Sequence, residues 1–171
     1  ASRAVLECHT FEEAARRIFD VACKATGAVS GYVALLNAEG TQNEVLFLES
    51  GGLSCQVDPD LPMPIRGLRA EAYANAEVAY DNDFARSSWM AFIPPGHVEM
   101  RNVLFAPLAI EGKVVGVIGL ANKPDDFTER DVRIAEHLGN MTAIALRRVR
   151  IEDQLRERDS LLRATGAMAT V

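Results

Sequence analysis

The sequence predicts an α+β fold, in which an antiparallel sheet is flanked by helices. Three observations support this prediction. Apolar strand-like runs come in pairs joined by short turns, which is typical of antiparallel hairpins. Helical periodicity is confined to the start, the middle and the end of the chain. The resulting order of helix, two strands, helix, three strands and helix differs from the regular strand–helix alternation of parallel sheets.

The first predicted helix begins at Thr10, because Thr10 and Glu13 form a capping-box pattern. Its apolar positions recur at helical spacing: Phe11, Ala14, Ala15, Ile18, Phe19 and Ala22. Gly27 ends the helix, since glycine is favoured just past a helix C-terminus. Cys23 falls on the apolar side, so we expect it to be a small core residue. Strands are expected at residues 31–37 and 43–49.

The middle of the chain alternates short elements with long connections. Residues 51–67 are rich in Gly, Pro and Asp and are expected to be loop. A short helix is predicted for 68–75 and a short strand for 77–81, followed by an irregular stretch, 82–101. Because connections of this length inside a compact domain are usually functional, we expect them to cap one face of the sheet. A pocket beneath that cap is the default binding site.

A hairpin at residues 102–121 is the clearest element. Its first strand is apolar on both faces, which is typical of a strand covered on two sides. Glu111-Gly112 supplies a tight turn. Gly116 and Gly119 interrupt the second strand, and we expect a packing reason for them, with close approach of a ligand as the alternative.

The last helix is predicted to run from Thr128 to about Leu162. Apolar residues repeat along it at spacing seven in two offset series, a coiled-coil pattern that includes two arginines. The expected dimer seam contains Met141, Ile144, Arg148, Ile151, Leu155 and Leu162. The alternative is a helix that folds back on its own domain. We therefore divide the chain into a lead-in, 1–9, a globular domain, 10–148, and a signalling helix and tail, 149–171.

The charge, the apolar runs and the cysteines of the chain exclude some classes of function. The net charge of −6 over 171 residues argues against a general nucleic-acid-binding surface. No apolar run reaches the about 18 residues of a membrane span, and no signal peptide is evident. Three cysteines without paired spacing fit the reducing cytoplasm. The chain does not begin with Met, so we expect it to be part of a longer protein.

No catalytic or metal site is predicted. The chain has no Ser-His-Asp, HExxH, P-loop or CxxC pattern, so we do not expect an enzyme. Cys8-His9 alone is too small a set for a metal. Asp81 and Asp83 are expected to form a solvated turn, with a metal or acid/base pair as the alternative.

The candidate pocket residues come from the cap. Trp89, Met90 and Phe92 are large apolar residues in a loop-like segment, and the simplest expectation is that they seal the open face of the sheet. The alternative is that some of them contact a small ligand whose polar groups are placed by charged neighbours. The candidate set is Arg66, Tyr73, Asp81, Asn82, Asp83, Trp89 and His97.

Three stretches resemble the GAF domain family, the sensor module of phytochromes, cyclic-nucleotide phosphodiesterases and bacterial signalling proteins. They are NVLFAPL (102–108), GKVVGVIGLANKP (112–124) and FTERD (127–131). The segments YDND (80–83) and PPGH (94–97) resemble a subgroup found in sensor histidine kinases and cyclase-type regulators. The resemblance covers residues 5–148. It implies a central antiparallel sheet with a loop-rich cap.

The resemblance also assigns a structural role to four residues. In the phosphodiesterase GAF domains, an Asn-Lys, a spaced Phe and an Asp-Glu brace the fold. Here Asn122, Lys123, Phe127 and Asp131 match, and Val132 replaces the Glu. The resemblance implies a Lys123–Asp131 ion pair, worth about 0 to 1 kcal/mol if exposed.

The known GAF cofactors fit this chain poorly. Bilin-binding members attach the chromophore through a cap cysteine, whereas no Cys follows Cys55, which comes too early, and Cys8 lies in the wrong element. Heme-binding members use a histidine ligand, and His97 is better explained as part of a loop turn. The cysteine spacing also differs from that of the methionine sulfoxide reductases of this fold. Covalent bilin and heme are therefore not expected, and the cofactor stays unassigned.

The functional prediction is a regulatory, small-molecule-sensing domain of a cytoplasmic signal-transduction protein, such as a two-component histidine kinase. Ligand state would pass through a dimeric helix to an output domain beyond Val171. The expected partners are a second copy of the chain and a small molecule, without nucleic acid or membrane insertion. One alternative is a structural dimerisation module with no ligand. Another is a small redox enzyme on the same fold.

Overall fold

The computed structural model describes residues 11–58 and 60–168, and their elements follow the predicted order. The helices, 3-10 helices (η) and strands are α2 (Phe11–Thr26), β1 (Ser30–Leu36), β2 (Gln42–Glu49), β3 (Met63–Pro64), α3 (Leu68–Asn75), β4 (Ala79–Asp81), η1 (Phe84–Arg86), η2 (Ser88–Phe92), β5 (Val103–Ile110), β6 (Lys113–Ala121) and α4 (Glu129–Met168).

The strands form one six-stranded antiparallel sheet in the order β3-β2-β1-β6-β5-β4. The α+β prediction is therefore confirmed. The β5–β6 hairpin turns at Glu111-Gly112, where both residues have positive φ, as a two-residue turn of the predicted kind requires. Thr10 and the Cys8-His9 pair lie outside the described residues.

Two expectations for the middle of the chain need correction. The stretch 51–67 contains the short strand β3, which pairs with the start of β2. The irregular stretch 82–101 contains the two 3-10 helices η1 and η2. These three elements have two to five residues each, which is too short for local periodicity to indicate them, and β3 also depends on pairing with β2.

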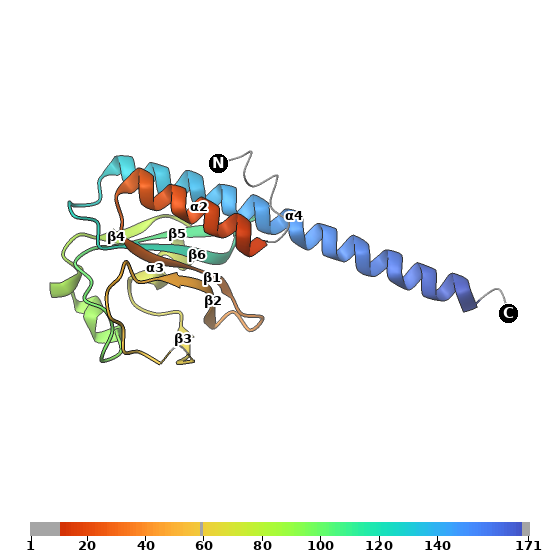
Figure 1. Ribbon diagram of the computed structural model, residues 1–171, viewed down its shortest axis with the longest axis horizontal. Helices are drawn as coiled ribbons and strands as arrows, with labels where there is room; N and C mark the ends of the chain where they lie inside the picture. Colours follow the sequence, from red (N-terminus) through yellow and green to blue (C-terminus); the bar gives the residue numbers. More distant parts are fainter. Residues whose placement is uncertain (1–10, 59, 169–171) are drawn as a thin grey trace.

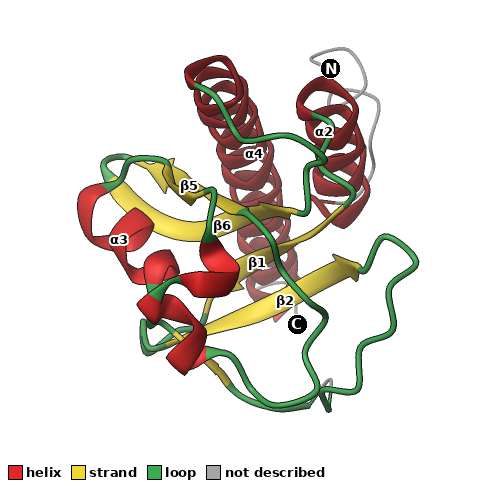
Figure 2. Cartoon of the chain, turned by 90° about the vertical axis from the view of Figure 1, so that its left-hand side faces the viewer, coloured by secondary structure: helices red, strands yellow, loops and turns green. Residues whose placement is uncertain are grey.

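The sheet separates two layers. Helices α2 and α4 cover one face, while α3, η1, η2 and the long connections lie over the other (Figure 2). The main core fills the space between the helix pair and the sheet, and it includes Ala15, Ile18, Phe19, Leu104, Ile118, Leu120 and Leu138. Cys23 packs against this core as predicted, and burial, followed by Asp20 and Glu49, raises its pKa to about 11.

The start of α4 is fixed to the sheet by a hydrogen-bonded cluster around the buried Asn102 and Asp131, which we call the brace: Asn82, Asn102, Lys123, Phe127, Thr128 and Asp131. Lys123 Nζ donates to Asp131 Oδ2 at 2.6 Å, and the same oxygen accepts from Thr128 N and Oγ1 at 2.9 Å. The Lys123 side chain is 14% exposed and the Asp131 side chain is 3% exposed, so the ion pair is largely buried. Removal of one partner would therefore leave a largely buried charge without its counter-charge, which costs more than the loss of a surface pair.

Two asparagines complete the brace. Asn102, which is fully buried, donates to the carbonyls of Lys123 and Asp125 and accepts from Lys123 N. Asn82 donates to the Phe127 carbonyl at 3.0 Å and accepts from Phe127 N at 2.7 Å. Asn82 was expected in the pocket. Its amide group instead joins the segment after β4 to the loop before α4.

Helix α4 packs on the domain through its first half and then extends beyond it (Figure 1). Ala143, Ala145 and Leu146 are buried, and Met141 is half-buried against the main core. The remaining apolar residues of the predicted seam are exposed: Ile144, Ile151, Leu155 and Leu162. Within the described residues, no helix is both long enough and apolar enough to cross a membrane.

Candidate functional site

The candidate site is a cavity between the sheet and the cap. It has a small chamber of about 110 Å³ and a large chamber of about 460 Å³, and both are lined by Arg69, Phe84, His97 and Phe105. Strands β1, β5 and β6 form the floor of the small chamber. The walls of the large one include residues 57–58, 61–64, 66–69, 89, 92–94 and 97. The larger volume lies within the range of small-molecule sites.

The interrupting glycine of β6 shapes the floor. A Cβ on Gly119 would lie 2.8 Å from the Tyr32 ring and 3.2 Å from that of Phe105. Glycine therefore lets the Tyr32 ring lie close against the strand. A Cβ on Gly116 would meet the Ala34 carbonyl at 2.6 Å and the side chains of Leu108 and Leu35 at 3.0 Å. These contacts support the packing interpretation of both glycines, and at Gly119 that packing also places Tyr32 beside the chamber.

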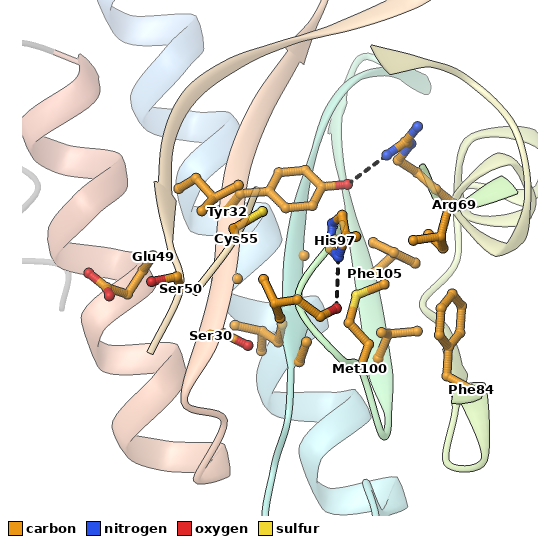
Figure 3. Close-up of a pocket in the computed structure, with 18 of the residues that line it drawn as sticks. Ser30, Tyr32, Glu49, Ser50, Cys55, Arg69, Phe84, His97, Met100 and Phe105 are labelled. Atoms are coloured by element: carbon orange, nitrogen blue, oxygen red, sulfur yellow. Dashed lines mark hydrogen bonds between the residues drawn. The ribbon is translucent and has the colours of Figure 1, made fainter. Parts of the chain in front are cut away.

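Arg69 is the cationic group in the wall of both chambers. Its Nη1 donates to Tyr32 Oη at 3.1 Å, and its Nη2 donates to the Pro64 carbonyl at 2.5 Å (Figure 3). Its Nε is buried without a hydrogen-bond partner. Among the described residues, no carboxylate lies within 4.0 Å of this guanidinium, whereas Arg86, Arg101, Arg147, Arg148 and Arg156 each have one.

Two more polar atoms near the cavity have no partner. Ser30 Oγ, in the wall of the small chamber, and Asn43 Oδ1 are both buried and unbonded. Asn43 Nδ2 donates to Tyr73 Oη at 3.2 Å. Burial and the neighbouring Tyr32 raise the pKa of Tyr73 well above its usual value, although Arg69 opposes that shift. Tyr73 therefore stays a neutral hydroxyl at physiological pH.

His97 and Cys55 also line both chambers. His97 Nδ1 lies 2.9 Å from the Val98 carbonyl, so this nitrogen carries the proton and donates. Cys55 was set aside in the sequence as too early for the cap, yet the fold brings it to the cavity wall as an exposed thiol. Within residues 11–58 and 60–168, no cluster of three His, Cys, Asp or Glu side chains could hold a metal ion.

Only three of the seven candidate pocket residues line the cavity. Arg66, Trp89 and His97 do so, with Arg66 exposed at the rim and bonded to the Phe92 carbonyl at 3.3 Å. Tyr73, Asp81, Asn82 and Asp83 line neither chamber. Asp81 Oδ1 accepts from Asp83 N at 2.8 Å, which is the turn geometry expected for this pair. Trp89 packs beside Leu68 and Phe84 in the cap cluster.

The sequence analysis did not select Arg69 or Tyr32 as cavity residues. For Arg69, however, the helical spacing of its neighbours indicated an inward position. Ala72 and Tyr73 lie three and four residues after Arg69, so the three share one face of α3. Ala72 is fully buried and Tyr73 is half-buried, which turns that face inward. An arginine on the inward face of a short helix marks a buried cationic position. No comparable pattern indicated Tyr32, because the alternation of residues along a strand does not distinguish a tyrosine in the core from one that lines a cavity.

The chain belongs to the GAF domain family, whose sequence pattern matches residues 8–147. GAF domains are commonly sensor modules of signalling proteins. The chain is 28% identical, over 140 residues, to the methyl sulfide methyltransferase-associated sensor of Methanosarcina acetivorans. This alignment covers 79% of the chain and 14% of that relative, so the chain spans a small part of the relative's length.

Two solved structures illustrate the fold. The GAF domain of an Acinetobacter phosphoenolpyruvate-protein phosphotransferase matches with a TM-score of 0.72 at 15% identity, covering 88% of this chain and 90% of that one. The free methionine-R-sulfoxide reductase of Neisseria meningitidis matches with a TM-score of 0.69 at 17% identity, covering 88% and 86%. Both likenesses concern the fold alone, and the second of these proteins is a reductase by name.

Proposed function

We propose that this chain is a regulatory GAF domain that binds a small molecule beneath its cap. The observation that carries the proposal is the two-chambered cavity, with mainly apolar walls and a few inward polar groups. Small-molecule sites usually combine these two properties. The sensor domain comprises residues 10–148 of a cytoplasmic signalling protein, and residues 149–171 lead to an output domain beyond Val171.

The path from the cavity to α4 is short. Val103 and Ala121 line the small chamber at the ends of β5 and β6. Asn102 and Lys123 of the brace lie one and two residues away from them along the chain, and Lys123 pairs with Asp131 in the first turn of α4. A ligand that moves these strand ends would therefore change the position of α4 through hydrogen bonds already in place.

The output is proposed to be a change within a parallel dimer of α4. Ile144, Ile151, Leu155 and Leu162 recur at coiled-coil spacing and are exposed in the single chain. Arg148 belongs to the same seam and bonds Glu152 at 2.8 Å. Charged groups in the seam weaken it, which suits a helix that shifts between two arrangements. A sensor histidine kinase, a cyclic-di-nucleotide enzyme or a transcriptional regulator would each suit such an output.

A structural dimerisation module with no ligand is the second candidate, favoured by the exposed seam. Native mass spectrometry of protein purified from its own host tests both. The sensor proposal expects a bound small molecule, and its release should alter α4 cross-linking through cysteines placed at Ile151. A dimer that never carries or responds to a metabolite supports the structural module. A strict monomer that retains all of α4 contradicts dimeric signalling.

A further inference from the structure

The polar character of the cavity is concentrated at one end. Arg69 and Tyr32 approach each other there, while the acidic wall residue Glu49 lies at the opposite side (Figure 3). The only other acidic wall residue, Asp58, belongs to the large chamber, and both acids are exposed. The Arg69 end is therefore cationic without a compensating carboxylate among the described residues.

The guanidinium has free capacity for an acceptor. Of its five N–H groups, the hydrogen bonds to Tyr32 and Pro64 use two, and the Nε–H is buried without a partner. A guanidinium pairs with a carboxylate through two parallel N–H···O bonds, and Nη1 and Nη2 of Arg69 each keep one further N–H for such a pair. The Tyr32 hydroxyl accepts from Arg69 and still has its own proton to donate.

The remaining walls of the cavity are mainly apolar. Phe84, Ile93 and Phe105 line both chambers, and Trp89 lines the large one. A ligand that fits must therefore present an apolar body to these walls and a single anionic group to Arg69. A cationic ligand is disfavoured by Arg69. A phosphate dianion would leave one of its charges unpaired in a mainly apolar site.

We propose that the cavity binds a small carboxylic acid with an apolar body, whose carboxylate pairs with Arg69. This inference rests on the proposed sensor function and adds the ligand class. The carboxylate accepts from the guanidinium edge and from the Tyr32 hydroxyl, and the apolar body extends past Phe105 into the large chamber. Arg66, which bonds the Phe92 carbonyl at the rim, has no part in this recognition.

The test compares octanoate, 1-octanol and n-octyl phosphate, which share one apolar body. Binding is followed by calorimetry and by fluorescence of Trp89, the single tryptophan. Octanoate is expected to bind at least about tenfold more tightly than octanol. Arg69→Met and Arg69→Gln should remove that preference and leave octanol binding within about twofold, whereas Arg66→Met, the matched control, should keep it.

The outcomes distinguish a failure of the carboxylate assignment from a failure of the proposed sensor function. Equal binding of octanoate and octanol, or a preference that survives in both Arg69 variants, overturns the carboxylate assignment and leaves a ligand-binding domain. A clear preference for octyl phosphate also overturns it. If no probe binds and native mass spectrometry finds no molecule, both proposals fail. Melting curves of the two Arg69 variants establish that they are folded, and Arg69→Gln keeps hydrogen-bonding capacity without the charge.

Discussion

The brace and the Arg69 end of the cavity both contain buried polar side chains, but they differ in how fully those groups are bonded. In the brace, Asn102 makes three hydrogen bonds and the Lys123 ammonium pairs with Asp131. The three buried side-chain polar atoms found without a partner in the described residues lie elsewhere, on Ser30, Asn43 and Arg69.

This difference separates a structural polar cluster from a binding one. Buried polar groups stabilise a fold only when their hydrogen bonds are made, because an unmet donor or acceptor costs about 1–3 kcal/mol. The brace meets that condition and fixes the start of α4. The cavity end does not, so its unpartnered polar groups reduce stability in the empty protein, and we propose that they bind a ligand. Opposite responses to mutation are therefore expected from the two regions.

The largest expected effect is at the brace. Asp131→Asn should lower the free energy of unfolding by about 3 kcal/mol, because it leaves the largely buried Lys123 ammonium without its counter-charge. Urea denaturation measures the change. Asp126→Asn is the matched control, since Asp126 pairs with Arg101 at the surface and should lose no more than about 1 kcal/mol. Equal losses in the two variants would show that burial of the pair adds nothing.

The same pair predicts a pH dependence. Burial raises the pKa of Asp131, but hydrogen bonds from Lys123 and Thr128 outweigh it, so its pKa lies below the usual value. A carboxyl with a lowered folded-state pKa stabilises the protein above its unfolded pKa of about 3.9, and that contribution is lost as pH falls through the folded value. The stability difference between wild type and Asp131→Asn should therefore shrink below about pH 4. A difference constant down to pH 2 contradicts this assignment.

An intermediate effect is expected at the cavity floor. Gly119→Ala places a Cβ 2.8 Å from the Tyr32 ring and should lower stability by about 1–3 kcal/mol through overpacking. It should also displace Tyr32 from Arg69 and weaken octanoate binding. Thermal unfolding and calorimetry report the two effects. Unchanged stability would mean that Tyr32 moves aside freely, and the floor would then not define the position of its hydroxyl.

The smallest effect is expected where a buried charge is removed from the cavity. Arg69→Met should change the free energy of unfolding by no more than about 1 kcal/mol in the empty protein, because the loss of its hydrogen bonds to Tyr32 and Pro64 is offset by the removal of a buried Nε donor that has no partner. Lys123→Met in the brace is the matched comparison and should be strongly destabilising. If Arg69→Met proves as damaging as Lys123→Met, the two regions have the same structural role.

The sequence determined the order of elements, the antiparallel hairpins and the long last helix, because these follow from local periodicity and turn chemistry. The GAF resemblance also indicated the pairing of Lys123 with Asp131, whose residues lie close in the chain. The sequence predicted that a pocket lies beneath the cap, but it did not identify most of the residues that line it. Four of its seven candidate residues lie elsewhere, since a polar residue in a loop has the same sequence appearance whether it bonds backbone or faces a pocket.

Tertiary structure alone decided which polar groups face the cavity. Arg69, Tyr32 and Ser30 come from α3 and β1, and only the packing of α3 over the sheet brings them to the same cavity. Whether a buried donor finds a partner depends on segments dozens of residues away, which no local pattern encodes. Sequence therefore indicated the family and the Lys123–Asp131 pair, while the fold revealed an Arg69 guanidinium without a carboxylate partner among the described residues, on which the proposed ligand class depends.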